Sequence, residues 1–265
     1  MRRRWIAPGA IVWLLAAAAF FLIPLIATLL FSLRSLQTNK CCSHAAYSLV
    51  VHDHQFWTTI RVSFLLSLET ITISLLLFVP TVYWVHLKLP RLRPVLGAMA
   101  LVPFVVPPII LVVGLLNLYK GSPSWFYDKP YGFLATAYVI LAFPYMYFAL
   151  DAGFRSIDVH TLTDASHSLG ASWPTTLVRV ILPNIRVAAL GGSFLTLAIV
   201  MGEFTIASLS AFNTFPTYIQ VVNESQPYEA AALSLLSFLI VWAAMLALLF
   251  VGRGRPRPAQ VAATR

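Results

Sequence analysis

The stretch from Asp164 to Ile185 reads DASHSLGASWPTTLVRVILPNI, and it decides how the rest of the chain is interpreted. It is polar and is interrupted by Gly170, Pro174 and Pro183, although it lies between two apolar segments. A hairpin between two membrane spans needs only a few residues. The length and polarity of this stretch therefore indicate an ordered element with a task of its own.

The segment 158–170, DVHTLTDASHSLG, predicts a short helix. Asp158 or Ser156 can cap its start, because a side-chain oxygen can accept a backbone N–H left unpaired in a first turn. Apolar residues recur at three- and four-residue spacing, and Gly170 can adopt the positive φ that ends a helix. An amphipathic helix lying on lipid headgroups is the alternative. Such a helix carries lysine and arginine beside its apolar face, and this segment has neither.

Residues 172–182 predict a second helix, which the glycine sets at an angle to the first. Ser172 can cap it, and Pro174 falls in its first turn, where a missing N–H costs nothing. We expect this helix to reach Leu182 and to be interrupted at Pro183. Two short helices of this kind form a surface that another protein can grip.

The composition places this element in a membrane protein. Of the 265 residues, 59% are hydrophobic and 10% are charged, whereas soluble domains have a smaller apolar and a larger charged share. Six apolar runs are long enough to cross about 30 Å of hydrocarbon. They are Ala10–Leu33, Val62–Val85, Val95–Leu118, Phe133–Leu150, Val187–Leu209 and Ala230–Val251. We expect an all-α membrane protein with six transmembrane helices.

Lysine and arginine set the expected orientation, because positively charged loops are retained in the cytoplasm. With six spans, thirteen of the 18 basic residues fall on the side that holds both termini, and five fall on the other. We therefore expect both termini to be cytoplasmic. The net charge of +9 follows from this topology, and because the cations are spread over loops we expect no nucleic-acid partner.

Several other classes of protein fit poorly. The N-terminal MRRRW and its apolar run could be a secretory signal, but the run is long and no A-x-A-like site follows, so we interpret it as the first span. No G-x-x-x-x-G-K-[ST] stretch is present, so the chain itself is not expected to bind ATP. An intramembrane enzyme would need a histidine or aspartate pair at one depth, and His86 lies only at the end of a span.

The loop after the first predicted span contains possible metal ligands and thiols. Adjacent cysteines such as Cys41 and Cys42 bond to each other only through a strained turn. His52 and His54 lie two residues apart in a loop without fixed geometry, which favours weak binding at most. We expect incidental loop residues and no metal site.

Prolines recur inside the predicted spans, most densely in LVPFVVPPIILVVG at residues 101–114. A proline frees a helix carbonyl, which neighbouring helices or a water-lined cavity must satisfy. The third span is therefore expected to be kinked and packed against other helices. A gate and a purely structural kink both remain open.

The inner loop resembles that of the inner-membrane permease subunits of binding-protein-dependent ABC importers. That family carries E-A-A, three residues, G, nine residues and then I-x-L-P. The matching residues here are Asp164, Ala165, Ser166, Gly170, Val180, Ile181, Leu182 and Pro183, without a gap. The differences (Asp for Glu, Ser for Ala, Val for Ile) are conservative. The resemblance extends to VPPI, AFPYMYF and MGEFTIASL, and covers roughly residues 10–251.

The resemblance implies a type I ABC importer permease fold, a single domain over residues 1–265 with a coupling loop at 151–186. In that family the first short helix docks in a cleft of a separate ATPase subunit, which binds ATP and Mg and moves the membrane helices. Small Ala165 and Ser166 would allow close approach, Gly170 would set the angle, and Pro183 would fix the passage into the fifth span.

The same resemblance implies the partners and the location. They are ABC ATPase subunits, a second permease subunit (homologous or identical), an extracytoplasmic solute-binding protein and membrane lipid, in the bacterial inner membrane. The chain would have no cofactor and no enzymatic activity of its own.

Two carboxylates fall inside predicted spans, Glu69 and Glu203, where a charge costs at least a few kcal/mol unless it is hydrated or paired. Ser193, Thr196 and Ser210 share one helical stripe with Glu203. The second span has its own stripe, Ser63, Ser67, Thr70, Ser74 and Thr81. These stripes predict a translocation pathway, with packing between helices as the alternative. Glu69 lies off its stripe, so structural pairing fits it as well as substrate contact does.

The segment 201–219, MGEFTIASLSAFNTFPTYI, looks most like permeases for spermidine and putrescine, whose relatives handle aminophosphonates or ferric ion. If water reaches Glu203, it stays charged and favours a cation, whereas a dry site would leave it protonated as a hydrogen-bond donor. The resemblance implies a polyamine or related cationic amine as the substrate. Contacts with a docked binding protein or simple solvation are expected for the outer-loop residues Asn213, Tyr218, Asn223 and Glu224. A stand-alone ion-coupled transporter is the alternative class, but it would be expected to show an internal repeat, and none is evident.

Overall fold

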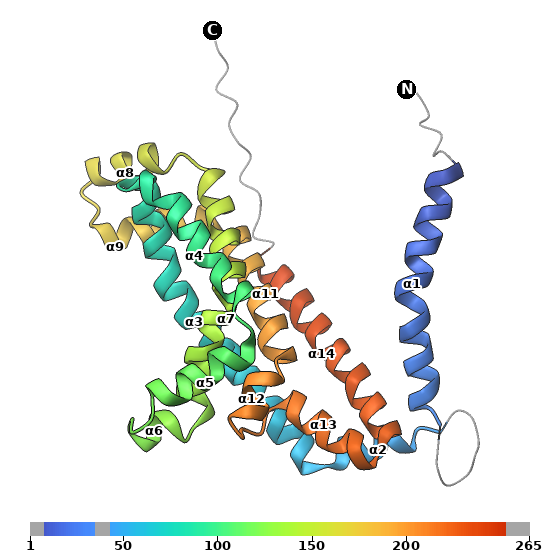
Figure 1. Cartoon of the computed structure of the whole chain (residues 1–265). Helices are drawn as coiled ribbons and strands as arrows, with labels where there is room; N and C mark the ends of the chain where they lie inside the picture. The colour runs from blue at the N-terminus through green and yellow to red at the C-terminus, as the bar shows by residue number, and fades with distance from the viewer. Residues whose placement is uncertain (1–7, 35–42, 253–265) are drawn as a thin grey trace. The chain divides into compact units, whose positions relative to one another are not determined.

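The computed structural model describes residues 8–34 and 43–252, and in these residues it contains helices and no strand (Figure 1). Four of its helices are long and apolar enough to cross a membrane. They are α1 (Pro8–Ser32), α3 (His54–Leu87), α7 (Pro130–Arg155) and α14 (Pro227–Gly252). Two further helix pairs are each bent at a break, and counting each pair as one span brings the total to six. The predicted all-α membrane fold is confirmed.

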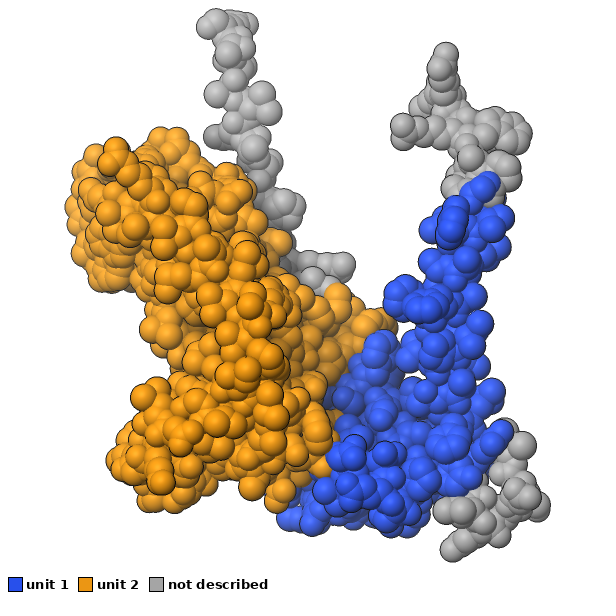
Figure 2. Space-filling model, in the orientation of Figure 1, with its two compact units in different colours: residues 1–58, 218–240 blue, residues 59–217, 241–265 orange. Residues whose placement is uncertain are grey.

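The chain divides into two compact units, Met1–Thr58 with Tyr218–Ile240 and Thr59–Thr217 with Val241–Arg265 (Figure 2). The first unit contains α1, α2 (Ala45–His52), most of α13 (Phe215–Ser225) and the first half of α14. Nearly all described side chains of α1 are exposed, as expected for a helix that faces lipid.

Two contacts tie the C-terminal end of α1 to other helices of the first unit. The Ser32 and Tyr47 hydroxyls are hydrogen-bonded at 2.8 Å, which joins α1 to α2. The rings of Phe31 and Tyr228 lie 4.8 Å apart, which joins α1 to α14.

In the second unit, α3 and α7 contribute to two separate apolar cores. One core contains buried Tyr83 and Phe154, and the other contains buried Leu66 and Phe133. Close approach of α7 and α11 (Arg186–Gly202) depends on glycine. A Cβ on Gly192 would lie 2.8 Å from the Met146 sulfur. Small residues commonly let membrane helices approach in this way.

The predicted third span is not one kinked helix, which corrects the sequence-based expectation. After a 3₁₀ turn (Pro90–Leu92), α4 (Arg93–Val105) and α5 (Pro108–Leu118) meet at 100°. A residue before proline is pushed into the extended region. Because Val106 and Pro107 each precede a proline, both are extended, with ψ of 116° and 140°. Two consecutive extended residues break the helix instead of bending it. A short helix, α6 (Ser124–Tyr127), then leads to α7.

The predicted fifth span is also discontinuous. It consists of α11 and a short α12 (Thr205–Leu209), separated by Glu203 and Phe204. The segment before it, Trp173–Asn184, meets α11 at 80°. The inner loop therefore turns sharply into the membrane helix at Ile185.

Candidate coupling and translocation sites

The first short helix of the inner loop is α8 (Val159–Ser168), and a carboxylate fixes its start. Asp158 accepts hydrogen bonds from the Thr161 hydroxyl at 2.7 Å and from the Thr161 backbone N–H at 3.1 Å. These bonds lower the pKa of Asp158 because they favour its ionised form. Of the two predicted caps, Asp158 is the one used, whereas the Ser156 hydroxyl donates to the Gly153 carbonyl.

Backbone bonds around Gly170 fix the other end of α8. Gly170 has a φ of +79°, and its N–H donates to the His167 carbonyl at 2.9 Å. The Ala171 N–H donates to the Ser166 carbonyl at 3.1 Å. This pair of bonds is a Schellman motif, which requires the left-handed conformation that glycine adopts without strain. The predicted glycine end of the helix is confirmed.

One face of α8 is bonded to the rest of the second unit. Val159, Thr163 and Ser166 are buried on this face. The Thr163 hydroxyl lies 3.2 Å from the Tyr83 hydroxyl of α3. Ser166 is hydrogen-bonded to the Thr176 hydroxyl in the following helical segment. Ser166 was expected to allow close approach of a partner; its side chain faces inward, toward Thr176.

The opposite face of α8 is open. Asp164, Ala165 and Gly170 are exposed, and Leu169 is 88% exposed at the end of the helix. Of the predicted coupling residues in this helix, Asp164 and Ala165 therefore lie on an available surface.

The second inner-loop helix has three parts, α9 (Trp173–Thr175), a π-helical turn (Thr176–Ile181) and α10 (Leu182–Asn184). Pro183 was expected to interrupt it, but the helix continues to Asn184, so this expectation is wrong. Pro183 lies in α10, directly after the π-helical turn, whose last bond runs from the Leu182 N–H to the Leu177 carbonyl. The Asn184 side-chain amide donates to the Val180 carbonyl at 2.7 Å. Val180 and Leu182 are half-buried, and Leu182 packs against the core near α8.

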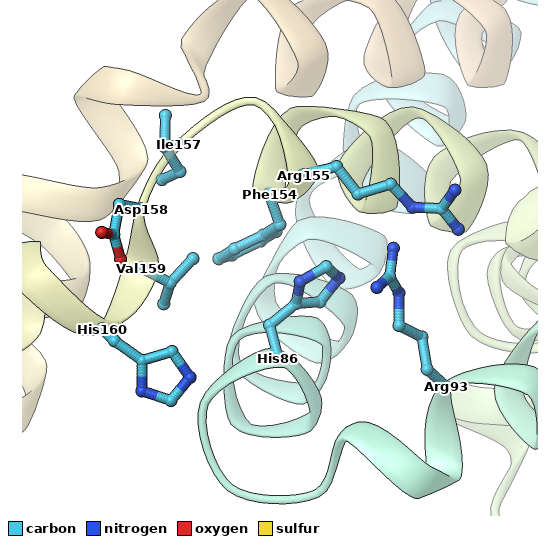
Figure 3. A pocket seen from close by; sticks show the side chains of 8 residues that line it. All are labelled: His86, Arg93, Phe154, Arg155, Ile157, Asp158, Val159 and His160. Carbon is cyan, nitrogen blue, oxygen red and sulfur yellow. The ribbon is translucent and has the colours of Figure 1, made fainter.

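An ion cluster around a buried carboxylate, beside α8, was missed in the sequence. Asp151 of α7 is 4% exposed, and its Oδ1 accepts hydrogen bonds from His86 Nε2 at 2.8 Å and Arg93 Nε at 3.0 Å. Arg155 Nη2 lies 2.5 Å from Oδ2. We call these four residues the Asp151 cluster, and three of them appear around a cavity in Figure 3. Because a buried carboxylate is costly without partners, the cluster fastens α3, α4 and α7 together.

The sequence did contain one signal for this cluster. Asp151 and Arg155 have the i,i+4 spacing of a helical ion pair. Arg93 and His86 lie at span ends that the predicted topology places on the same side of the membrane.

Glu203 lies in the break between α11 and α12, and the chain itself satisfies its carboxylate. Oε1 accepts the Ile206 N–H at 2.8 Å, and Oε2 accepts the Ala207 N–H at 3.3 Å and the Tyr138 hydroxyl at 3.0 Å. The residue is 8% exposed. A carboxylate at the first N–H groups of a helix acts as a cap, so Glu203 fastens α12 to α7.

The predicted stripe along the fifth span is therefore interrupted. Ser193 and Thr196 are buried in α11, but the chain leaves the helix at Glu203, so Ser210 does not continue their stripe. On α3, four members of the second stripe are buried and Thr81 is exposed. Burial of these hydroxyls within one chain favours the packing alternative.

Glu69 differs from Glu203. It is half-buried on α3, and its buried Oε2 has no hydrogen-bond partner among the described residues. The Ser74, Thr196 and Ser210 hydroxyl oxygens share this property. Together with Glu69 Oε2, these are the four predicted pathway oxygens that have no hydrogen-bond partner among the described residues.

In the first unit, the Tyr218 hydroxyl donates to Asp53 Oδ2 at 2.5 Å. Burial and this bond raise the pKa of Tyr218. Tyr218 was expected among the contacts of a binding protein, but it is 7% exposed and faces inward. The other three expected contacts, Asn213, Asn223 and Glu224, are exposed. Cys41 and Cys42 lie outside the described residues, within which no group of three His, Cys, Asp or Glu could hold a metal ion.

The fold and the inner loop define the class of protein: a multi-pass membrane protein with a two-helix loop before a broken span. The chain belongs to the family described as binding-protein-dependent transport system inner membrane components, whose model matches residues 70–254. This family is the permease component of ABC importers.

Two curated relatives are named for molybdenum transport. A putative molybdenum transport system permease protein of Bacillus subtilis is 30% identical over 47% of this chain, and the match spans 62% of that relative. The molybdenum transport system permease protein of Azotobacter vinelandii is 26% identical over 67% of this chain and 88% of its own length.

A solved structure supports the fold. The chain resembles a bacterial alginate ABC transporter, crystallised with an alginate pentasaccharide-bound periplasmic protein, with a TM-score of 0.66. The alignment covers 91% of this chain and 93% of the other, at 14% identity. The type I ABC importer permease fold is thus confirmed.

Proposed function

We propose that this chain is the permease subunit of an ATP-driven importer and that a separate ATPase subunit grips α8. The open face of α8 carries the proposal, because both ends of the helix are fixed and Leu169 stands 88% exposed. Covering a leucine side chain contributes about 1.5–3 kcal/mol. A partner cleft that accepts Leu169 beside the small Ala165 would gain that free energy.

The inward face of α8 supplies a route for motion. Thr163 is bonded to Tyr83 of α3, and Ser166 is bonded to Thr176 in the segment that turns into α11. A push on α8 would therefore move α3 and the start of α11 together. In this proposal ATP and Mg are bound by the ATPase, a second permease completes the pathway, and a binding protein delivers the solute on the opposite side. Both termini then lie in the cytoplasm.

For the substrate we propose a small oxyanion such as molybdate, in place of the polyamine that the sequence favoured. Two observations support this choice. The charge of Glu203 is held by three donors of its own chain, so it is a poor counter-ion for a cation. Two relatives are named for molybdenum transport. Glu69, with an unbonded oxygen, is the feature that keeps a cationic amine as the second candidate.

Uptake by the assembled transporter tests the proposal. The chain is reconstituted into vesicles with its ATPase and binding-protein partners, and labelled molybdate uptake is followed with sulfate or spermidine as competitor. We expect uptake that needs ATP on the α8 side, is inhibited by sulfate and is unaffected by spermidine. Uptake driven by an ion gradient without ATP would instead identify a secondary transporter. Inhibition of uptake by spermidine would favour the hypothesis that the substrate is a polyamine.

A further inference from the structure

Two neighbouring cavities of the second unit share the side chains of Arg93 and Arg155. One has a volume of about 610 Å³ and extends past His86 to the start of α8. The other has a volume of about 410 Å³ and extends along α4 and α7 past Pro94 and Tyr147. The two arginines therefore stand where both cavities meet.

The arginines carry more charge and more donors than the Asp151 cluster uses. Two guanidinium groups face one buried carboxylate, which leaves an excess of one positive charge even when His86 is neutral. Arg93 donates through Nε and Arg155 contacts Asp151 through Nη2. Their remaining N–H groups have no protein acceptor among the residues that the structure describes. A guanidinium offers five donors in a planar fork, so most of this capacity is open.

The open donors are reachable from solvent. The Arg155 side chain is 62% exposed and that of Arg93 is 31% exposed. In Figure 3 the two guanidinium groups lie together beside the His86 ring. The other acid at the cavity, Asp158, points away from them in Figure 3. Its carboxylate oxygens accept hydrogen bonds from Thr161. His160 is a further potential cation on the cavity wall.

We propose that Arg93 and Arg155 bind a phosphate-type oxyanion at this face of the membrane. Arginine pairs with phosphate through two parallel N–H···O bonds, which gives both strength and geometry. Basic pockets between membrane helices on the cytoplasmic side suit acidic lipid headgroups. The ligand is therefore the headgroup of an acidic phospholipid or free inorganic phosphate, which share this chemistry. It would join α4 to α7 beside α8. Placing the site in the cytoplasm rests on the proposed function, but the binding itself does not.

The test uses the purified full-length chain without ATPase. One sample, in neutral detergent, is titrated with inorganic phosphate. Another is placed in nanodiscs of phosphatidylcholine alone or mixed with phosphatidylglycerol. The readouts are the thermal unfolding midpoint and the lipid retained in native mass spectra. Stabilisation by phosphate in detergent identifies the free ion, and stabilisation only by phosphatidylglycerol identifies the lipid.

Arg155→Gln should weaken the stabilising ligand at least about tenfold, because a hydrogen bond to a charged group contributes about 1.5–3 kcal/mol and 1.4 kcal/mol is tenfold. The control Arg91→Gln removes the same charge from an exposed neighbour that lines neither cavity, and it should leave the affinity unchanged. The proposal is overturned if neither ligand stabilises the chain, or if both variants lose the same affinity.

Asp151→Asn separates binding from a structural role. It removes the carboxylate that competes with the ligand for both arginines, so the chain should become less stable while its affinity for phosphate or phosphatidylglycerol rises. A purely structural cluster would lose stability with no gain in affinity, and that result would contradict the proposal. Failure of binding would leave ATP-driven uptake untouched, so the two proposals fail separately.

Discussion

Replacing Glu203 by glutamine tests whether this carboxylate is a structural cap or a substrate contact. The carboxylate accepts three hydrogen bonds, from Ile206, Ala207 and Tyr138. The single amide oxygen of glutamine can keep the Ile206 bond, and the amide nitrogen can donate to a reversed Tyr138 hydroxyl. The Ala207 N–H then faces a donor. One hydrogen bond to a charged group is lost, so we expect a destabilisation of about 1.5–3 kcal/mol.

The assay is the unfolding free energy of the solubilised chain, measured in a double-mutant cycle with Tyr138→Phe. Because the two side chains are in contact, the cycle should give a coupling of about 0.5–3 kcal/mol. Glu224→Gln, which alters an exposed carboxylate of α13, should change stability by no more than about 0.5 kcal/mol. Uptake per assembled transporter should stay close to that of the unmodified chain.

The opposite pattern would refute this reasoning. If Glu203→Gln left stability unchanged and abolished uptake of a cationic amine, the carboxylate would be a substrate contact. The three intramolecular bonds would then not describe the transporting state.

Three further changes test local features. Gly192→Ala should destabilise the chain by about 1–3 kcal/mol because its Cβ would meet Met146. The control Gly191→Ala has open space around its Cβ and should be neutral or stabilising by up to about 1 kcal/mol. Equal unfolding midpoints for the two variants would contradict this. Ala211 has a φ of 58°, so Ala211→Gly should stabilise by about 1 kcal/mol in the same assay, and a loss would count against it. The pKa of Asp158 is lowered by its bonds to Thr161. Its stabilisation of α8 is therefore present above the pKa of the unfolded state and is lost as the pH falls through the pKa of the folded state. Asp158→Asn should remove this acid sensitivity of amide exchange in α8, and an unchanged pH profile would argue against the cap.

Helix ends with strong local chemistry were predictable from the sequence. Asp158 and Gly170 mark the start and the end of α8 as expected, because a capping carboxylate and a left-handed glycine act through the backbone next to them. Long apolar runs likewise became α1, α3, α7 and α14, since a span needs only length and hydrophobicity.

Features that depend on distant partners were not predictable. The partners of Asp151 lie on α3, α4 and α7, and one sequence does not reveal which helix ends meet. The Glu203 stripe failed because helical periodicity assumes an unbroken helix, and the break is stabilised by the Glu203 carboxylate itself. A single proline in a span predicts a kink, but the adjacent Pro107 and Pro108 hold two consecutive residues extended, and the result is a 100° break.

Binding of the ATPase to α8 tests the central claim most directly. Ala165→Trp places a bulky side chain on the open face of α8, while Ala98→Trp places the same side chain on an exposed position of α4. The purified chain is mixed with its ATPase subunit, and complex formation and ATP-driven uptake are measured together. We expect Ala165→Trp to insert and fold normally but to lose the complex and the uptake, and Ala98→Trp to keep the complex. An Ala165→Trp chain that binds the ATPase and transports normally would contradict the account.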